Sequence, residues 1–173
     1  MRDLKKCAQI RHDIKQYGEE ILRSKNFKDS ANNIQHSDVS VKKHCMKVAY
    51  TSMAINRKLR IKCNERELTR GALLHDYFLY DWHAPEHCGL KNLHGFFHPG
   101  IALKNANKEY TLSNREKNII ESHMWPLTLR HIPRCREAWV VTAADKYIST
   151  IDSLRLDKLF RKRAKVRVDS WEK

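Results

Sequence analysis

Two acidic side chains lie in segments of this sequence that are otherwise apolar. The adjacent pair His75-Asp76 directly follows two leucines, and Asp145 lies among valine, alanine and isoleucine residues that would share its face of a helix. A buried carboxylate is costly unless it is paired with a cation or bound to a metal. The sequence therefore predicts a cationic partner for both carboxylates.

A metal ion is the partner that accounts for the most of these groups at once. Lys146 adjoins Asp145, but neighbouring residues on a helix do not face each other, so we do not expect the two to pair. A metal shared by His44, His75-Asp76 and Asp145 would satisfy all four side chains. Imidazole and carboxylate ligands without thiolate suit Mn, Fe, Co, Ni or Zn. Such a metal lowers the pKa of a bound water and generates a nucleophile near neutral pH.

Helices are the elements predicted to position these groups. Apolar residues recur at spacings of three and four, and helix-capping residues such as Ser113, with Glu116 three positions later, mark several starts. The expected helices span residues 2–24, 40–59, 64–76, 101–107, 113–123 and a last segment from about 134 to 151. We expect residues 25–33 to form a polar linker, Pro99 to begin the fourth helix, and residues 77–93 to form an irregular loop. No segment gives a convincing strand signal.

The overall composition fits a single soluble domain that meets an anionic partner. The chain has 173 residues and only 5 glycines and 4 prolines, which favours long uninterrupted helices. The net charge of +14 indicates either an anionic partner or simply a basic solvated surface. The five cysteines form no C-x-x-C pair, and no signal peptide or membrane span is evident, so we expect a cytoplasmic protein.

The order of the candidate ligands resembles that of the HD superfamily of metal-dependent phosphohydrolases. The matching stretches are His-Cys-Met-Lys-Val-Ala from position 44, Gly-Ala-Leu-Leu-His-Asp from position 71 and Ala-Ala-Asp-Lys-Tyr from position 143. The resemblance covers roughly residues 35–151. It implies an all-α, HD-domain-like helical bundle with the metal site between core helices. The expected organisation is then an N-terminal helix and linker (1–33), the HD domain (34–156) and a basic C-terminal helix or tail (157–173).

Two further histidines extend the resemblance to branches of the superfamily that bind two metals. His98 and His123 lie between the His-Asp pair and the last aspartate, where those branches carry two extra histidines. The resemblance then implies six ligands, with Asp76 as the bridging carboxylate: His44, His75, Asp76, His98, His123 and Asp145. His94 competes with His98 for one position, and the helix expected after Pro99 favours His98. Two divalent ions are implied, with Fe or Mn favoured over Co, Ni, Zn or Mg. The alternative is a site for one metal, with His98 and His123 as ordinary histidines nearby.

The chain departs from the superfamily at one position that affects substrate binding. Many relatives carry Gly-Lys soon after His-Asp, and that lysine touches substrate phosphate, whereas here the pair is followed by an aromatic segment. Asp81 and His83 in this segment either replace the lysine as acid or base or hydrogen-bond the metal ligands. Lys146 either holds substrate phosphate as a point charge or faces solvent.

The leading functional prediction is hydrolysis of a phosphate ester or anhydride of a nucleotide or a related small molecule. The expected catalytic residues are Asp76, Lys146, His83 and Asp81. The ligand layout resembles that of bacterial dinucleoside-tetraphosphate hydrolases. One alternative is a mixed-valent di-iron oxygenase, which has the same ligand pattern. The other is a non-catalytic basic module that binds nucleotides or RNA, although nucleic acid is not the favoured partner and no membrane partner is expected.

Overall fold

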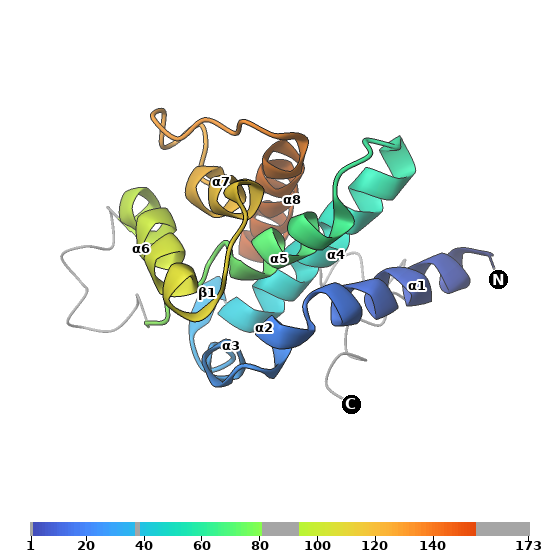
Figure 1. The fold of residues 1–173 in the computed structure, drawn as a ribbon, viewed down its shortest axis with the longest axis horizontal. Coiled ribbons are helices and arrows are strands. Elements are labelled where there is room, and N and C mark those ends of the chain that lie inside the picture. Colours follow the sequence, from blue (N-terminus) through green and yellow to red (C-terminus); the bar gives the residue numbers. More distant parts are fainter. Residues whose placement is uncertain (1, 37–38, 81–93, 155–173) are drawn as a thin grey trace.

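The protein is an assembly of helices, as the sequence predicts. The computed structural model describes residues 2–36, 39–80 and 94–154 (Figure 1). Its helices are α1 (Arg2–Tyr17), α2 (Glu19–Arg23), α3 (Lys25–Asp29), α4 (Val41–Leu59), α5 (Glu65–Leu74), α6 (His94–Glu109), α7 (Asn114–Ser122) and α8 (Arg136–Ser153). A short antiparallel pair, β1 (Ile34–His36) and β2 (Val39–Ser40), leads into α4. No strand was predicted for these residues.

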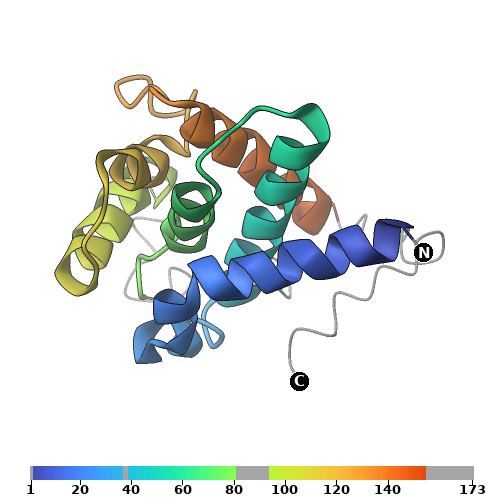
Figure 2. The same ribbon diagram turned by 45° about the vertical axis from the view of Figure 1, so that its right-hand side comes forward.

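Helix α5 lies at the centre of the fold. It packs against α4, α7 and α8, while α6 packs against α7 and α1 crosses α4 and α5 on the outside (Figures 1 and 2). Leu68, Leu73 and Leu74 on α5 are fully buried, and each such burial contributes about 1.5–3 kcal/mol. At Gly71, an added Cβ would lie 2.5 Å from Cδ1 of Ile119, so α5 and α7 approach this closely only because the residue is glycine.

Side-chain caps set the beginnings of the helices that carry the candidate ligands. The hydroxyl of Ser40 accepts a hydrogen bond from the Lys43 amide at the start of α4, and the side chain of Asn64 caps α5. Ser113 and Glu116 form both hydrogen bonds of the predicted capping box at the start of α7. These local signals are readable in the sequence because each involves residues only three positions apart.

The N-terminal segment differs from its prediction in two ways. The expected helix over 2–24 is interrupted at Gly18, where an added Cβ would lie 2.4 Å from Cδ1 of Leu73. The prediction of a linker from residue 25 was wrong over Lys25–Asp29, which form α3. Ser24 caps this helix by accepting a hydrogen bond from the Phe27 amide, and the Phe27 side chain is buried in the core. Burial of that aromatic ring outweighs the polar character of its neighbours.

Helix α6 begins earlier than the sequence predicts. It starts at His94, so Pro99 lies inside the helix and is not its first residue. A proline there removes one backbone hydrogen bond, which is why the sequence favoured a later start. The first turn packs closely on the segment after α7, because an added Cβ at Gly95 would lie 2.9 Å from Cδ2 of Leu127.

Candidate metal centre

Five helices converge on a buried cluster of imidazoles and carboxylates. The cluster contains the six predicted ligands, all of them at most 5% exposed: His44 on α4, His75 and Asp76 at the end of α5, His98 on α6, His123 after α7 and Asp145 on α8. Asp76 lies between two groups of histidines, and each of its carboxylate oxygens faces a different group. The structure therefore brings together residues that are spread over a hundred positions of the chain.

The first group surrounds Oδ2 of Asp76. This oxygen lies 3.3 Å from Nε2 of His75 and 3.6 Å from Nε2 of His44, and the two Nε2 atoms are 3.3 Å apart. Oδ1 of Asp145 lies 3.1 Å from Nε2 of His44 and 3.8 Å from Nε2 of His75. Two imidazoles and two carboxylates thus direct their donor atoms at one small volume.

The second group surrounds Oδ1 of Asp76. This oxygen lies 3.2 Å from Nε2 of His98 and 3.4 Å from Nε2 of His123. The two Nε2 atoms are 2.7 Å apart. The donor atoms of His98, His123 and Asp76 all lie within 4.8 Å of one another, as do those of His44, His75 and Asp76. Asp76 is the residue that the two groups share.

Helix ends orient two of the imidazoles. Nδ1 of His75 lies 2.8 Å from the carbonyl oxygen of Ala72, and Nδ1 of His123 lies 2.8 Å from that of Ile120. Both histidines are the C-cap residues of their helices, where the last carbonyls lack helical partners. A carbonyl only accepts, so each Nδ1 carries the proton and donates it. In the neutral ring the lone pair of Nε2 is then directed into the cluster, as in a metal-ligating histidine.

Positive charge stabilises the buried carboxylates of the cluster. Burial raises the pKa of the Asp76 carboxyl, but the charge of His75 and the hydrogen bonds from His123, His75 and His98 together outweigh burial and hold the pKa well below its usual value. Burial also raises the pKa of Asp145, and hydrogen bonding to His44 and His75 lowers it further than burial raises it. Burial, with the nearby charges of His98 and His75, lowers the pKa of His123 to about 4. Burial lowers the pKa values of His44 and His75, but their contacts with the nearby carboxylates outweigh burial and raise both. The cluster thus holds two carboxylates that favour ionisation, two imidazoles that favour positive charge beside them, and one imidazole that resists protonation.

The donor set fits a divalent transition metal. Oδ1 of Asp76 is fully buried and makes no hydrogen bond within the described part of the chain, although two imidazole nitrogens face it. A cation between these donors would satisfy the orphaned oxygen and the converging lone pairs together. Imidazole nitrogen and carboxylate oxygen without thiolate are typical ligands of Mn, Fe, Co, Ni and Zn.

Lys146 lies beside the cluster, and one expectation about it was wrong. Its Nζ lies 3.1 Å from Oδ2 of Asp145 and 3.1 Å from the carbonyl oxygen of His123, and its side chain is 42% exposed. Adjacent helical residues were not expected to pair, but the long lysine side chain bends back over the end of the Asp145 carboxylate. A cationic group therefore stands between the buried cluster and solvent.

Three predicted candidates are not placed by the structure. Asp81 and His83 lie outside the described residues. The backbone of His94 forms the first residue of α6, but its side chain is not described. His98, its competitor, has its imidazole in the cluster.

Three polar side chains that the sequence analysis missed contact the cluster. Nε2 of Gln35 donates to Oδ2 of Asp76 at 2.7 Å, and Oγ of Ser149 donates to Oδ1 of Asp145 at 3.0 Å. Oδ2 of Asp152 lies 3.9 Å from Nδ1 of His44. Ser149 and Asp152 follow Asp145 by four and seven positions on α8, so helical spacing was an available signal. Gln35 belongs to the unpredicted hairpin, and nothing in its local sequence marked it.

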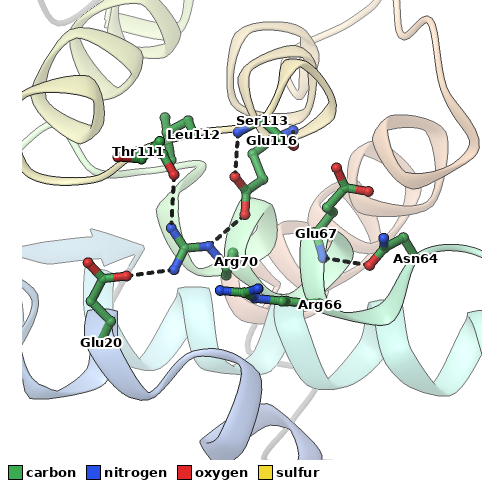
Figure 3. Close-up of a pocket in the computed structure, with 9 residues that line it drawn as sticks. All are labelled: Glu20, Asn64, Arg66, Glu67, Arg70, Thr111, Leu112, Ser113 and Glu116. Carbon is green, nitrogen blue, oxygen red and sulfur yellow. Dashed lines mark hydrogen bonds and ion pairs between the residues drawn. The ribbon is translucent and has the colours of Figure 1, made fainter.

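A surface pocket elsewhere in the protein contains ion pairs that join parts of the fold. It encloses about 520 Å³ and is lined by Arg70, Glu20 and Glu116 among others (Figure 3). The guanidinium of Arg70 donates to Glu116 at 2.6 Å and to Glu20 at 2.8 Å. None of the six cluster residues lines this pocket. The Arg70 charge is therefore compensated by two carboxylates from other parts of the fold.

Comparison with known families identifies the domain that carries the cluster. A family model described as the HD domain matches residues 41–150, which is more than half of the chain. The chain therefore belongs to the HD-domain family, whose members are mostly metal-dependent phosphohydrolases. Neither the comparison with curated proteins nor that with solved structures found a match. Among the described residues, no helix is long and apolar enough to span a bilayer.

Proposed function

We propose that this protein is a two-metal phosphohydrolase that cleaves an ester or anhydride bond of a nucleotide or similar small phosphorylated molecule. The observation that supports this most strongly is the position of Asp76. Its Oδ2 faces His44 and His75, and its Oδ1 faces His98 and His123. A carboxylate shared in this way would supply a ligand oxygen to each of two metal ions, which could activate water and polarise a phosphoryl oxygen.

The proposed ligands are the six residues of the cluster, with Fe or Mn as the favoured ions. When bound, such metals lower the pKa of a water molecule and polarise a phosphoryl oxygen. Asp145 would complete the ligands on the His44 side, because its Oδ1 lies within 4 Å of both imidazoles there. The carbonyl oxygens behind His75 and His123 hold those rings with Nε2 directed inward.

Lys146 is the proposed contact for the substrate phosphate. Its ammonium group is partly exposed while also touching Asp145, so it can meet an anion at the edge of the cluster. A positive charge at this place would offset negative charge that develops on the phosphoryl group. The net charge of +14 also favours association with an anionic substrate. Asp81 and His83 are the proposed acid–base or ligand-orienting residues of the segment after α5.

Metal content and phosphate release together test this function. Separate preparations loaded with Mn, Fe, Co, Ni or Mg would be assayed against dinucleoside polyphosphates, nucleotides and phosphomonoesters. We expect two ions per chain in the active preparation and release of phosphate or of a shorter nucleotide from at least one substrate. Failure of every metal to support turnover of any substrate would contradict the proposal.

Further measurements on the same protein distinguish the alternative activities. Oxygen consumption, with an electron paramagnetic resonance signal from a mixed-valent iron pair, would identify an oxygenase, since hydrolysis needs neither. Nucleic-acid binding that survives Asp76→Ala, in a parent protein without turnover, would indicate a binding module. The completeness of the cluster, with all six donors buried, favours hydrolysis over a degenerate binding module.

A further inference from the structure

Asp152 presents a buried carboxylate to the outer side of a proposed ligand. It lies on α8 and is 3% exposed. Its Oδ1 lies 2.6 Å from Nζ of Lys47, whereas its Oδ2 makes no hydrogen bond within the described residues and lies 3.9 Å from Nδ1 of His44. One oxygen therefore forms an ion pair with a residue of α4, and the other faces the imidazole.

His44 differs from His75 and His123 in where it lies on its helix. Those two imidazoles follow helix ends, where free carbonyl oxygens accept their Nδ1 protons. His44 is the fourth residue of α4, and the carbonyls of this turn are engaged in the hydrogen bonds of the helix. An acceptor for its Nδ1 must therefore come from another element of the fold.

Helix α8 supplies groups to both nitrogens of this one imidazole. Asp145 and Asp152 are seven residues apart, which is about two helical turns, so both lie on the face of α8 that meets α4. Oδ1 of Asp145 lies 3.1 Å from Nε2 of His44, and Oδ2 of Asp152 lies on the Nδ1 side. The ring is thus held between two carboxylates of a single helix.

We propose that Asp152 is a positioning residue that keeps the proton of His44 on Nδ1 and so leaves Nε2 free to bind metal. This inference rests on the metal site proposed above. The 3.9 Å between Oδ2 and Nδ1 is longer than a hydrogen bond, so the carboxylate or the ring must shift for Oδ2 to accept the proton, and within the described residues Oδ2 gives up no other hydrogen bond by moving. Lys47 compensates the buried charge of Asp152 from its other side. A carboxylate behind a ligating imidazole fixes its tautomer and increases its basicity.

Zn²⁺ binding to full-length Asp152→Asn tests the proposal. Asparagine preserves the shape of the side chain but removes its charge, and we expect the affinity for Zn²⁺ on the His44 side to fall by about 10- to 100-fold. Glu116→Gln is the matched control, because Glu116 is also a buried carboxylate that pairs with a cation of another helix, at 2.6 Å. It lies near the start of α7, away from His123. We expect this control to lose stability without losing affinity for Zn²⁺.

The tautomer of His44 separates positioning from a merely structural role. In ¹⁵N spectra of the Zn²⁺-loaded parent, we expect His44 to carry its proton on Nδ1 with Nε2 bound to metal, and we expect this signature to weaken in Asp152→Asn. The double variant Lys47→Met/Asp152→Leu replaces the ion pair with apolar side chains of similar size. It should fold and still show the loss of affinity, which covers the case in which Asp152→Asn is too unstable.

Three results would overturn the inference. An unchanged affinity and tautomer in both variants would show that Asp152 only joins α4 to α8, while the metal site itself would stand. An equal loss of affinity in Glu116→Gln would show that general destabilisation is the cause. A parent protein that binds no Zn²⁺ or any other divalent ion would remove the proposed metal site, and this inference with it.

Discussion

Nε2 of His44 lies 3.1 Å from Oδ1 of Asp145, although the two residues are 101 positions apart in the sequence. This contact joins α4 to α8 and closes one side of the cluster around Asp76. Both side chains are almost completely buried, so neither can exchange the other for water. Two helices thus meet at a buried polar contact. Such an arrangement is typical of a functional site rather than of a core selected only for packing.

Binding of both proposed metals should depend on Asp76, whereas binding of only one should depend on His98. In Asp76→Ala, we expect metal content to fall for both ions and turnover to be lost, because both groups lose their shared oxygen. In His98→Ala, we expect about one ion per chain to remain, held by the His44 group. Elemental analysis of proteins purified side by side measures this difference. Retention of both ions by Asp76→Ala would rule out the bridging role.

Lys146→Ala should impair turnover without affecting metal content. The ammonium contacts the outer oxygen of Asp145 and the backbone carbonyl oxygen of His123, and it contacts neither imidazole nor the Asp145 oxygen that faces His44, so we expect the metal ligands to remain in place. Loss of a cation near the reacting phosphate should lower kcat/KM by about 10- to 1000-fold, which steady-state kinetics would detect. Lys146→Arg is the control that keeps the charge, and it should retain more activity than alanine. Equal activity of the parent and the alanine variant would place Lys146 outside the reaction.

Gly71→Ala should destabilise the protein because α5 and α7 touch at this position. The new Cβ would lie 2.5 Å from Cδ1 of Ile119, which must move within a packed core. We expect a loss of about 1–3 kcal/mol in the free energy of unfolding, measured by denaturant titration. Gly100→Ala on α6 is the control, since nothing lies within 4 Å of its added Cβ. That variant should gain up to about 1 kcal/mol from helix propensity.

Asp13 should make the stability of the fold depend on acid pH. Oδ2 of Asp13 accepts a hydrogen bond from Nη2 of Arg57 at 2.6 Å, and Gln9 donates to Oδ1 at 2.8 Å. Burial raises the pKa of this carboxyl, but the contacts with Arg57 and Gln9 outweigh burial and lower the pKa below its ordinary value of 3.8. The folded state therefore binds this proton less tightly than the unfolded state.

The direction in which stability changes with pH can be tested. The contribution of Asp13 is fully present above the unfolded pKa near 3.8 and disappears as pH falls through the lower folded pKa. Asp13→Asn should therefore be less stable than the parent by about 1 kcal/mol at neutral pH. The two proteins should converge in stability below about pH 3. A constant difference between them from pH 7 to pH 2, by thermal unfolding, would contradict the assignment.

Predictions from the sequence succeeded where the physical cause is local. The capping box of Ser113 and Glu116 depends on residues three positions apart, and it is present. The prediction of α4 was accurate to one residue at its start because Ser40 marks it. Predictions failed where a distant contact decides the outcome, as at Gly95, whose close packing on Leu127 accompanies the early start of α6.

The sequence by itself determined the helical class, the family and the identity of the polar side chains that need a partner in an apolar core. Periodicity, caps and the cost of a buried carboxylate are properties of residues within a few positions of one another, so they can be read without coordinates. Only the tertiary structure decided that each oxygen of Asp76 meets a different imidazole pair, and that Gln35 and Asp152 contact the same cluster. Those relationships depend on how separate helices and a hairpin pack, and packing is set by the whole core rather than by any one segment.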